Sequence, residues 1–151
     1  MNNSFSNQLS KSIVKTLNES IELGGKASLV VCGGNSPLSI YQKLSLADLD
    51  WNNVSIYLGD DRLLPSDHID SNENLLRKNL LINNAKSAKF HPLVQPRIDI
   101  KNIILPFDIV LLGLGLDGHF ASLFPEQVKL RSAFSIDAEP NFVCSDIPLA
   151  V

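Results

Sequence analysis

The chain has 151 residues, of which 44% are hydrophobic and 19% are charged, a composition typical of one globular domain with a substantial core. Its formal net charge of −3 argues against a broad cationic surface for nucleic acid, and no apolar run approaches the ~18 residues of a membrane span. The N-terminus also lacks the basic start and apolar centre of a secretory signal. We therefore expect a single domain over residues 1–151, located in the cytoplasm, with no nucleic-acid partner and no membrane partner.

The first elements predicted along the chain are a long helix, a buried strand and a short helix. Apolar residues recur every four positions over residues 5–21, which predicts an amphipathic helix that ends at a glycine pair. Residues 28–32 form a continuous apolar run typical of a buried strand, and the loop 33–37 follows it. In this loop Ser36 can cap a second helix that has Pro37 at its first position.

The middle of the chain predicts a second strand over residues 54–58, followed by a loop over residues 59–67. Asp70 with Glu73 three residues later resembles a capping box, which predicts the start of a third helix. The polar, proline-interrupted stretch that follows predicts only a short strand at residues 89–91.

Residues 107–112 predict another buried strand, which leads into the loop 113–119, and a further strand is predicted at residues 141–144. Alternating strands and helices predict a three-layer, Rossmann-like α/β fold, with a mainly parallel sheet and helices on both faces. Ligands bind such sheets at the carboxyl ends of the strands, where the loops 33–37, 59–67 and 113–119 lie. Because the chain stops without a closing helix, we expect its C-terminal part to be truncated.

The cysteines and histidines do not form a recognisable metal site. Cys32 and Cys144 lie far apart in apolar segments, and we expect both to be small buried residues. His68 and His91 lie in polar or proline-flanked segments and are expected at the surface. No group of His, Cys and carboxylate residues has the spacing of metal ligands, and the G-x-S-x-G motif of serine nucleophiles is absent.

Gly113, Gly115 and Gly118 match the G-x-G-x-x-G pattern of dinucleotide-binding turns. Such a turn should open a long helix whose N-terminus faces the pyrophosphate, yet Pro125 interrupts the chain shortly afterwards. Asp117 would also place a negative charge where the phosphates approach. The sequence therefore argues against a dinucleotide site here.

His119 is the strongest candidate for a catalytic residue, because it follows the end of an apolar strand. An ordinary imidazole pKa near 6.5 allows it to take a proton from water at neutral pH, and Asp117 is close enough in sequence to orient the ring. The alternative interpretation is that His119 caps a short helix.

Two further loops could bind an anion. The residues from Gly33 to Ser36 offer backbone N–H groups, an amide and a hydroxyl at a helix start, which suits phosphate, although glycines also simply make turns. Arg62 follows two aspartates, and its guanidinium could bind phosphate or carboxylate oxygens or instead form an internal salt bridge.

Taken together, these loops resemble a known family, the 6-phosphogluconolactonases, within a fold group that includes glucosamine-6-phosphate deaminase and ribose-5-phosphate isomerase. The resemblance covers residues 28–125, about two thirds of the chain. It rests on three sequence blocks in order: GGNSP at residues 33–37, GDDR at 59–62 with DSN at 70–72, and GLGLDGHFASLFP at 113–125.

The resemblance implies hydrolysis of 6-phosphoglucono-δ-lactone to 6-phosphogluconate, without a metal or an organic cofactor. It implies that His119 is the general base, with Asp117 beside it in the catalytic pair. The substrate-binding residues that it implies are Gly33, Gly34, Asn35, Ser36, Asp60, Arg62, Asn72, Gly115 and Gly118. The alternatives are a sugar-phosphate deaminase or isomerase of the same fold, and a non-catalytic module that binds sugar phosphates.

Overall fold

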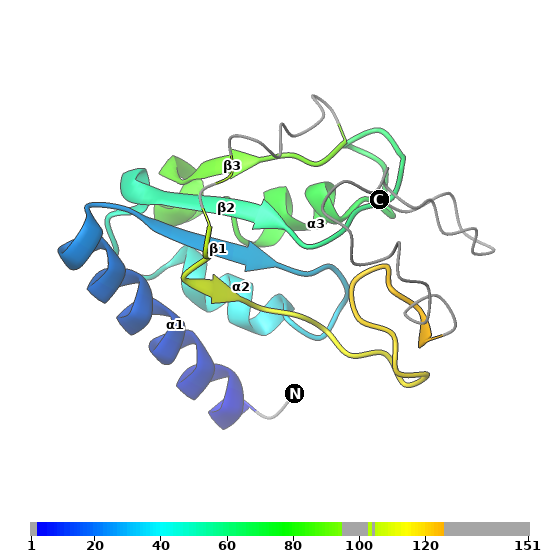
Figure 1. The fold of residues 1–151 in the computed structure, drawn as a ribbon, viewed down its shortest axis with the longest axis horizontal. Helices are drawn as coiled ribbons and strands as arrows, with labels where there is room; N and C mark the ends of the chain where they lie inside the picture. The colour runs from blue at the N-terminus through cyan, green and yellow to red at the C-terminus, as the bar shows by residue number, and fades with distance from the viewer. Residues whose placement is uncertain (1–2, 95–102, 104, 126–151) are drawn as a thin grey trace.

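The centre of the molecule is a parallel sheet. The computed structural model describes residues 3–94, 103 and 105–125. Its strands are hydrogen-bonded in the order β3-β2-β1-β4 (Figure 1), and all neighbours run parallel. The strands are β1 (Ala27–Val31), β2 (Val54–Leu58), β3 (Lys89–His91) and β4 (Ile109–Val110). These strands confirm the predicted parallel sheet, while the strand predicted at residues 141–144 lies outside the described residues.

Helices connect the strands. Helix α1 (Asn3–Gly24) precedes β1. Helix α2 (Leu38–Ser45) and the 3-10 helix η1 (Trp51–Asn53) connect β1 with β2. Helix α3 (Asn72–Asn79) and the 3-10 helix η2 (Asn83–Ser87) connect β2 with β3. Such crossovers are required because the end of one parallel strand and the start of the next lie at opposite edges of the sheet. Within the described part of the chain, no helix combines the length and the apolar character needed to cross a membrane.

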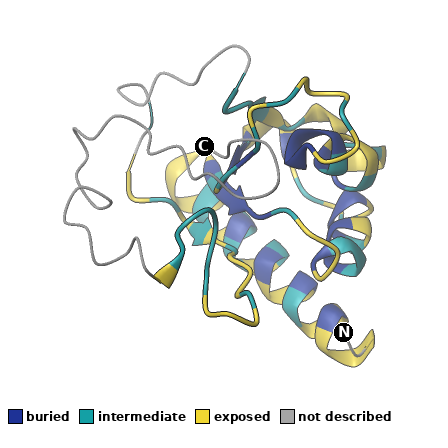
Figure 2. Cartoon of the chain, turned by 90° about the vertical axis from the view of Figure 1, so that its right-hand side faces the viewer, coloured by how far each residue is buried: buried dark blue, intermediate teal, exposed yellow. Residues whose placement is uncertain are grey.

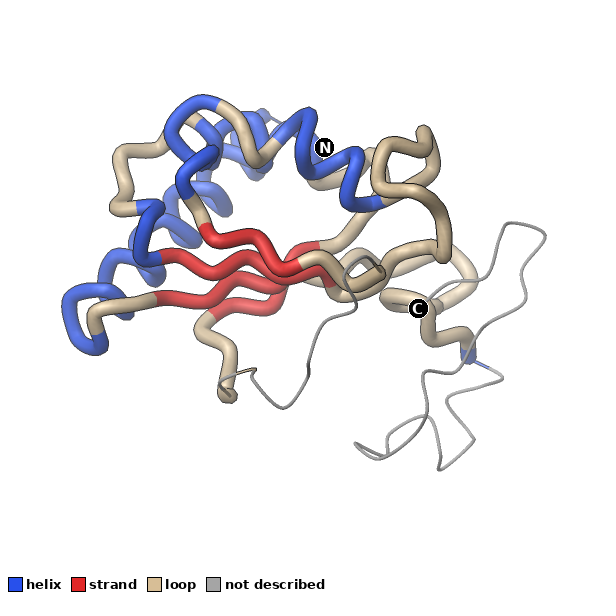
Figure 3. The backbone as a smooth tube through the Cα atoms, turned by 90° about the horizontal axis from the view of Figure 1, so that it is seen from above, coloured by secondary structure: helices blue, strands red, loops and turns tan. Residues whose placement is uncertain are grey.

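The hydrophobic core lies between one face of the sheet and the helices. Leu29 and Ile56 of the sheet form one buried cluster with Leu17 of α1, Ile40 of α2 and Leu76 of α3. Burial of one such side chain contributes about 1.5–3 kcal/mol to stability. Figure 2 shows the buried residues gathered in this region, and Figure 3 shows the helices along one side of the sheet. The described helices therefore form one of the two helical layers of the predicted three-layer architecture.

Two predicted helix caps are wrong. Ser71, rather than Asp70, caps α3, because Ser71 has the extended backbone that a cap requires and its Oγ accepts a hydrogen bond from the Asn74 N–H at 3.3 Å. At the start of α2, Pro37 already has helix-like backbone angles, with φ −84° and ψ −4°. The described structure shows no side-chain cap there, so Ser36 is free for another role.

β4 is shorter than the strand predicted at residues 107–112. Among the described strands it pairs with β1 alone, and the side chains of Val110 and Leu112 are 51% and 45% exposed. The Leu111 N–H still donates to the Val30 carbonyl oxygen at 2.9 Å, after which the chain leaves the sheet. A continuous apolar run can therefore form an edge strand, because the pattern of apolar residues in the sequence does not reveal how many neighbouring strands it pairs with.

The order of the strands creates a crevice at one end of the sheet. The chain passes from β1 to β2 on one side, whereas β4 lies on the other side of β1. The loops after β1 and β4 therefore diverge, and parallel sheets bind ligands at such a point. The fold places the residues after β1 and the residues after β4 on two sides of this crevice.

Candidate active site

A cavity of about 420 Å³ lies at the carboxyl end of the sheet, and its volume is in the range of small-molecule sites. The loops after β1, β2 and β4 all contribute to it. Predicted site residues that line it are Gly33, Gly34, Ser36, Asp60, Arg62, Asn72, Gly115 and His119. Residues that line it and were not predicted are Cys32, Pro37, Leu112, Gly113, Leu114 and Ala121.

His119 is held on two sides. Its Nδ1 lies 2.5 Å from Asp117 Oδ1, and its ring stacks on Phe124 with 4.9 Å between the ring centres. The hydrogen bond to His119 lowers the pKa of Asp117, so the carboxylate stays ionised at neutral pH and favours a proton on Nδ1. Nε2 then carries the lone pair of the neutral ring, and a side chain that is 36% exposed is open to water.

The loop around His119 is a tight turn. The Gly115 N–H donates to the His119 carbonyl oxygen at 2.7 Å, and Leu114 forms an antiparallel bridge with Phe120. Gly118 has φ +89°, a conformation that glycine adopts without steric cost. No helix begins at His119 in the described residues, so it is not a helix cap, and the long helix of a dinucleotide-binding turn does not follow within residues 119–125.

Gly115 lies directly against Asp117 and His119. A Cβ atom at this position would lie 2.3 Å from Cε1 and Nδ1 of His119, and 2.6 Å from Oδ1 of Asp117. These distances are far shorter than a van der Waals contact. Only glycine therefore permits the backbone and the imidazole to occupy these places together.

Gly33 plays a comparable role on the opposite wall. A Cβ atom at Gly33 would lie 1.8 Å from Asn72 Oδ1, and the Asn72 side chain donates from Nδ2 to the Asp60 carbonyl oxygen at 3.0 Å. Gly34 has φ +86° in the same turn. Among the described residues, the backbone N–H groups of Gly34, Asn35 and Ser36 donate to no acceptor. The turn therefore presents free donors beside the cavity, as an anion site requires.

Asp60 carries the negative charge of the cavity. Burial raises its pKa, and the neighbouring Asp61 acts in the same direction. The hydrogen bond from Ser122 and the charges of Arg62 and His119 act against this shift. Ser122 Oγ donates to Asp60 Oδ2 at 2.7 Å.

Asp61 points away from the cavity and organises its rim. The residue is 2% exposed, and its Oδ1 accepts from the Arg62 N–H at 2.8 Å and from the Asn72 N–H at 2.7 Å. Its Oδ2 accepts from the Glu73 N–H at 3.0 Å and the Ser71 hydroxyl at 3.2 Å. One buried carboxylate thus fixes the backbone of two residues that line the cavity. Asp61 was not predicted as a site residue, but its position between the predicted site residues Asp60 and Arg62 is a sequence feature that could have identified it.

The Arg62 guanidinium donates from Nη1 to the Asp70 carbonyl oxygen. Within the described residues, no carboxylate forms a salt bridge with Arg62, so the alternative of an internal salt bridge is not supported. Its remaining donors are available to an anion in the cavity.

The remaining predicted site residues do not line the cavity. Asp117 acts on it only through His119, and Gly118 forms the turn that brings these two side chains together. Asn35 is exposed in the turn after β1, where its carbonyl oxygen accepts from the Leu38 N–H at 3.4 Å. The Asn35 side chain therefore does not line the cavity, and a binding role for its backbone N–H stays a prediction.

The predictions for the other histidines and the cysteines have mixed outcomes. His68 lies at the surface, with its side chain 41% exposed, as expected. The surface position predicted for His91 is only partly correct, because the residue is half-buried: its Nε2 atom is buried, its ring stacks on Tyr57 with 4.4 Å between the ring centres, and burial lowers its pKa, with Lys89 acting in the same direction. Cys32 is buried as expected, and burial raises the pKa of its thiol. Cys144 lies outside the described residues.

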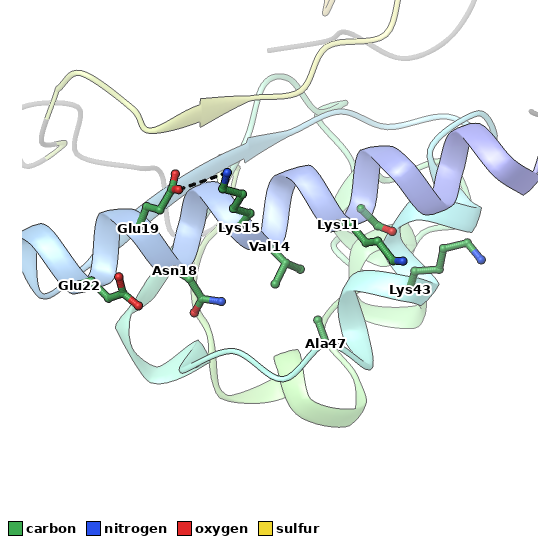
Figure 4. Close-up of a pocket in the computed structure, with 9 residues that line it drawn as sticks. Lys11, Val14, Lys15, Asn18, Glu19, Glu22, Lys43 and Ala47 are labelled. Atoms are coloured by element: carbon green, nitrogen blue, oxygen red, sulfur yellow. Dashed lines mark ion pairs between the residues drawn. The ribbon is translucent and has the colours of Figure 1, made fainter.

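A second hollow, of about 620 Å³, lies along α1 and the segment after α2. Figure 4 shows Val14 pointing toward Ala47 across it, while Lys15 pairs with Glu19 along α1 at 3.7 Å. Its charged side chains are lysines and glutamates, and all of them except Lys43 are exposed. Although this hollow is larger, the carboxyl-end cavity is the candidate active site, because it lies at the ends of parallel strands and combines an imidazole, a guanidinium and a glycine turn. In the described part of the chain, no cluster of His, Cys, Asp and Glu could hold a metal ion.

Comparisons with known proteins agree on one family. Residues 2–146 match the sequence profile described as glucosamine-6-phosphate isomerases/6-phosphogluconolactonase. A 6-phosphogluconolactonase of Pseudomonas aeruginosa is 38% identical over 136 residues, which cover 83% of this chain and 57% of the relative. A 6-phosphogluconolactonase of Neisseria meningitidis is 37% identical over 138 residues, which cover 83% of this chain and 59% of the relative.

A solved structure extends the similarity to the fold. The crystal structure of a 6-phosphogluconolactonase from Shewanella baltica matches with a TM-score of 0.81 and 38% identity, over 89% of this chain and 63% of that one. The chain therefore spans less than three fifths of the length of these two curated relatives.

Proposed function

This chain belongs to the family of glucosamine-6-phosphate isomerases and 6-phosphogluconolactonases, and we propose that it carries the water-activating site of a 6-phosphogluconolactonase. The reaction is the hydrolysis of 6-phosphoglucono-δ-lactone to 6-phosphogluconate, in the oxidative pentose phosphate pathway. One observation carries the proposal: His119, paired with Asp117, lines the same cavity as Arg62 and the glycine turn at residues 33–34.

In this proposal His119 Nε2 takes a proton from water as the water oxygen attacks the lactone carbonyl carbon. Asp117 stabilises the imidazolium that forms, because its carboxylate accepts the Nδ1–H. Collapse of the tetrahedral intermediate breaks the bond between the carbonyl carbon and the ring oxygen. The imidazolium then returns its proton to the leaving alkoxide, which becomes a hydroxyl group. The other product is a carboxylic acid, which loses its proton to water at neutral pH and leaves as the carboxylate.

The phosphate of the substrate would lie on the other side of the cavity. Arg62 and the N–H groups of the turn after β1 are the donors available there. Arginine suits phosphate because its planar fork of N–H groups matches two oxygens at once. This division of the cavity separates binding from chemistry, with Asp60 and Asn72 between the two ends.

A sugar-phosphate deaminase or isomerase is the competing activity within the family. The names of both curated relatives favour the lactonase. The loop after His119 also supplies Phe124, a stacking partner for the imidazole that cannot exchange protons. Lactone hydrolysis needs one base and a water, which this arrangement provides.

The test is a spectroscopic lactonase assay on the purified chain and on His119→Ala. We expect His119→Ala to lower kcat by about 10²- to 10⁴-fold, the range for loss of general-base assistance. His68→Ala is the matched control, because His68 lies at the surface and does not line the cavity. It should leave kcat unchanged.

Two results would contradict the proposal. Equal turnover by the wild-type chain and His119→Ala would remove His119 from the chemistry. A wild-type chain that binds 6-phosphogluconate but leaves the lactone to hydrolyse at its spontaneous rate would instead identify a non-catalytic sugar-phosphate module.

A further inference from the structure

One side-chain hydrogen bond joins two walls of the cavity. Ser122 Oγ donates to Asp60 Oδ2 at 2.7 Å. Within the described residues, no other hydrogen bond connects the loop 59–70 after β2 with the segment 111–125 after β4. Ser122 follows His119 by three residues, and Asp60 precedes Arg62 by two. The bond therefore connects the segment that carries the proposed base with the loop that carries the proposed phosphate ligand.

We propose that Ser122 is a positioning residue that acts through Asp60. Its hydroxyl holds the Asp60 carboxylate and keeps the His119 segment and the Arg62 loop facing one cavity. The proposal rests on the proposed function and deepens it, because no step of the hydrolysis uses Ser122 directly. Ser122 does not line the cavity, whereas Asp60 and the neighbouring Ala121 do.

The chemistry of the pair explains why the hydroxyl matters. A hydroxyl that donates to a carboxylate makes a charge-assisted hydrogen bond, which is stronger than a bond between neutral groups. Burial raises the pKa of Asp60, and the Ser122 hydrogen bond is the main influence that lowers it again. The charged and titratable groups that act on Asp60, or on which it acts, are Asp61, Arg62, His119, Cys32 and Tyr41. Loss of the hydroxyl would therefore favour the protonated carboxyl.

The experiment compares Ser122→Ala with Ser122→Thr, which keeps a hydroxyl. We expect Ser122→Ala to lower kcat/KM for 6-phosphoglucono-δ-lactone by about 10- to 100-fold, the effect of losing a hydrogen bond to a charged group. The pKa of the Asp60 carboxyl should rise at the same time, because the carboxylate loses its hydroxyl donor. Ser122→Thr should restore both properties. Ser66→Ala, an exposed serine of the same loop as Arg62, is the control and should match the wild type.

A double-mutant cycle shows whether Ser122 acts through Asp60. In an Asp60→Asn background the further change Ser122→Ala should cause little additional loss, because the charged acceptor is already absent. The proposal is overturned if the two losses of kcat/KM multiply, or if Ser122→Ala leaves the pKa of Asp60 at its wild-type value.

A titration of the Asp60 carboxyl by carbon NMR separates this proposal from the proposed function. The Asp60 pKa should rise in Ser122→Ala whether or not the chain turns over lactone. If the wild-type chain does not turn over lactone but the Asp60 pKa still rises in Ser122→Ala, the lactonase assignment is wrong and the coupling between Ser122 and Asp60 is retained. An unchanged Asp60 pKa defeats the positioning role of Ser122, whatever the activity.

Discussion

At the scale of single residues, Gly115 is a position where the structure leaves no space for a side chain. Any side chain there would collide with the imidazole of His119 and the carboxylate of Asp117. We expect Gly115→Ala to displace the His119 ring and to lower kcat by about 10²-fold, because a displacement of about 1 Å from the productive geometry costs that much. Steady-state lactone hydrolysis measures this effect.

Gly59→Ala is the control for that prediction. A Cβ atom at Gly59 would meet Leu112 Cδ2 at 3.5 Å and the Val31 carbonyl oxygen at 3.6 Å, which are ordinary contacts. Gly59 directly follows β2 but does not line the cavity, so Gly59→Ala should keep the wild-type kcat. If Gly115→Ala were as active as Gly59→Ala, the tight contact between Gly115 and His119 would not limit catalysis.

Residue-level predictions succeeded where the partners are close in the chain. Asp117 and His119 are two positions apart in one turn, so their contact could be expected from the sequence. The four hydrogen bonds that the Asp61 carboxylate accepts could not be expected from the sequence, because three of the donors lie ten to twelve residues away and only one is the next residue. The capping role of Ser71 was missed for a related reason: the backbone conformation that distinguishes it from Asp70 is not visible in residue types.

At the scale of elements, β4 is held by an interaction that compensates for its short length. The Ser28 N–H and hydroxyl donate to Asp108 Oδ2 at 2.7 and 2.6 Å, and the Asp108 N–H donates back to Ser28 Oγ at 2.9 Å. Burial raises the pKa of Asp108, but the hydrogen bonds from Ser28 and Ser20 outweigh burial and leave the pKa below its ordinary value of 3.8. The ionised Asp108 side chain thus connects the start of β4 to β1 through hydrogen bonds.

This arrangement predicts a dependence of stability on pH. A carboxyl whose pKa is lower in the folded state stabilises the fold above its unfolded pKa, and that contribution is lost as the pH falls through the folded value. We expect Asp108→Asn to lower the free energy of unfolding by about 1 kcal/mol at pH 7, a modest value because the carboxylate is exposed. The difference from the wild type should shrink below about pH 4.

Urea unfolding at pH 7 and at acidic pH measures this difference, with the buried Trp51, which is 1% exposed, as the fluorescent probe. Asp67→Asn is the control, because Asp67 is exposed and its side chain makes no hydrogen bond in the described residues. If Asp108→Asn lowered the free energy of unfolding by the same amount at both pH values, the charge of the carboxylate would not be what holds β4.

At the scale of the whole molecule, the cavity exists only when three strand-end loops are assembled. A ligand that binds there binds the folded state alone, so it must stabilise the fold. We expect 6-phosphogluconate at about 100 times its Kd to raise the free energy of unfolding by about 2.7 kcal/mol. Gluconate, which lacks the phosphate, should stabilise much less at the same concentration, and Arg62→Ala should reduce the difference between the two ligands.

Thermal unfolding with each ligand, in the wild type and in Arg62→Ala, tests this expectation. Lys86→Ala serves as a cationic control, since Lys86 is exposed on η2 and does not line the cavity. Equal stabilisation by gluconate and 6-phosphogluconate would show that the cavity does not recognise the phosphate.

Local chemistry along the chain was enough to locate the helices, most of the strands and the loops that carry chemistry. Apolar periodicity and turn residues act over a few positions, so they can be recognised without tertiary contacts. Only the tertiary structure decided that β1 lies between β2 and β4, which brings His119, Arg62 and Gly33 to one cavity. It also decided that β4 lies at an edge of the sheet formed by the described strands and that Ser122 reaches Asp60, because strand pairing and contacts between loops join residues that are distant in the chain.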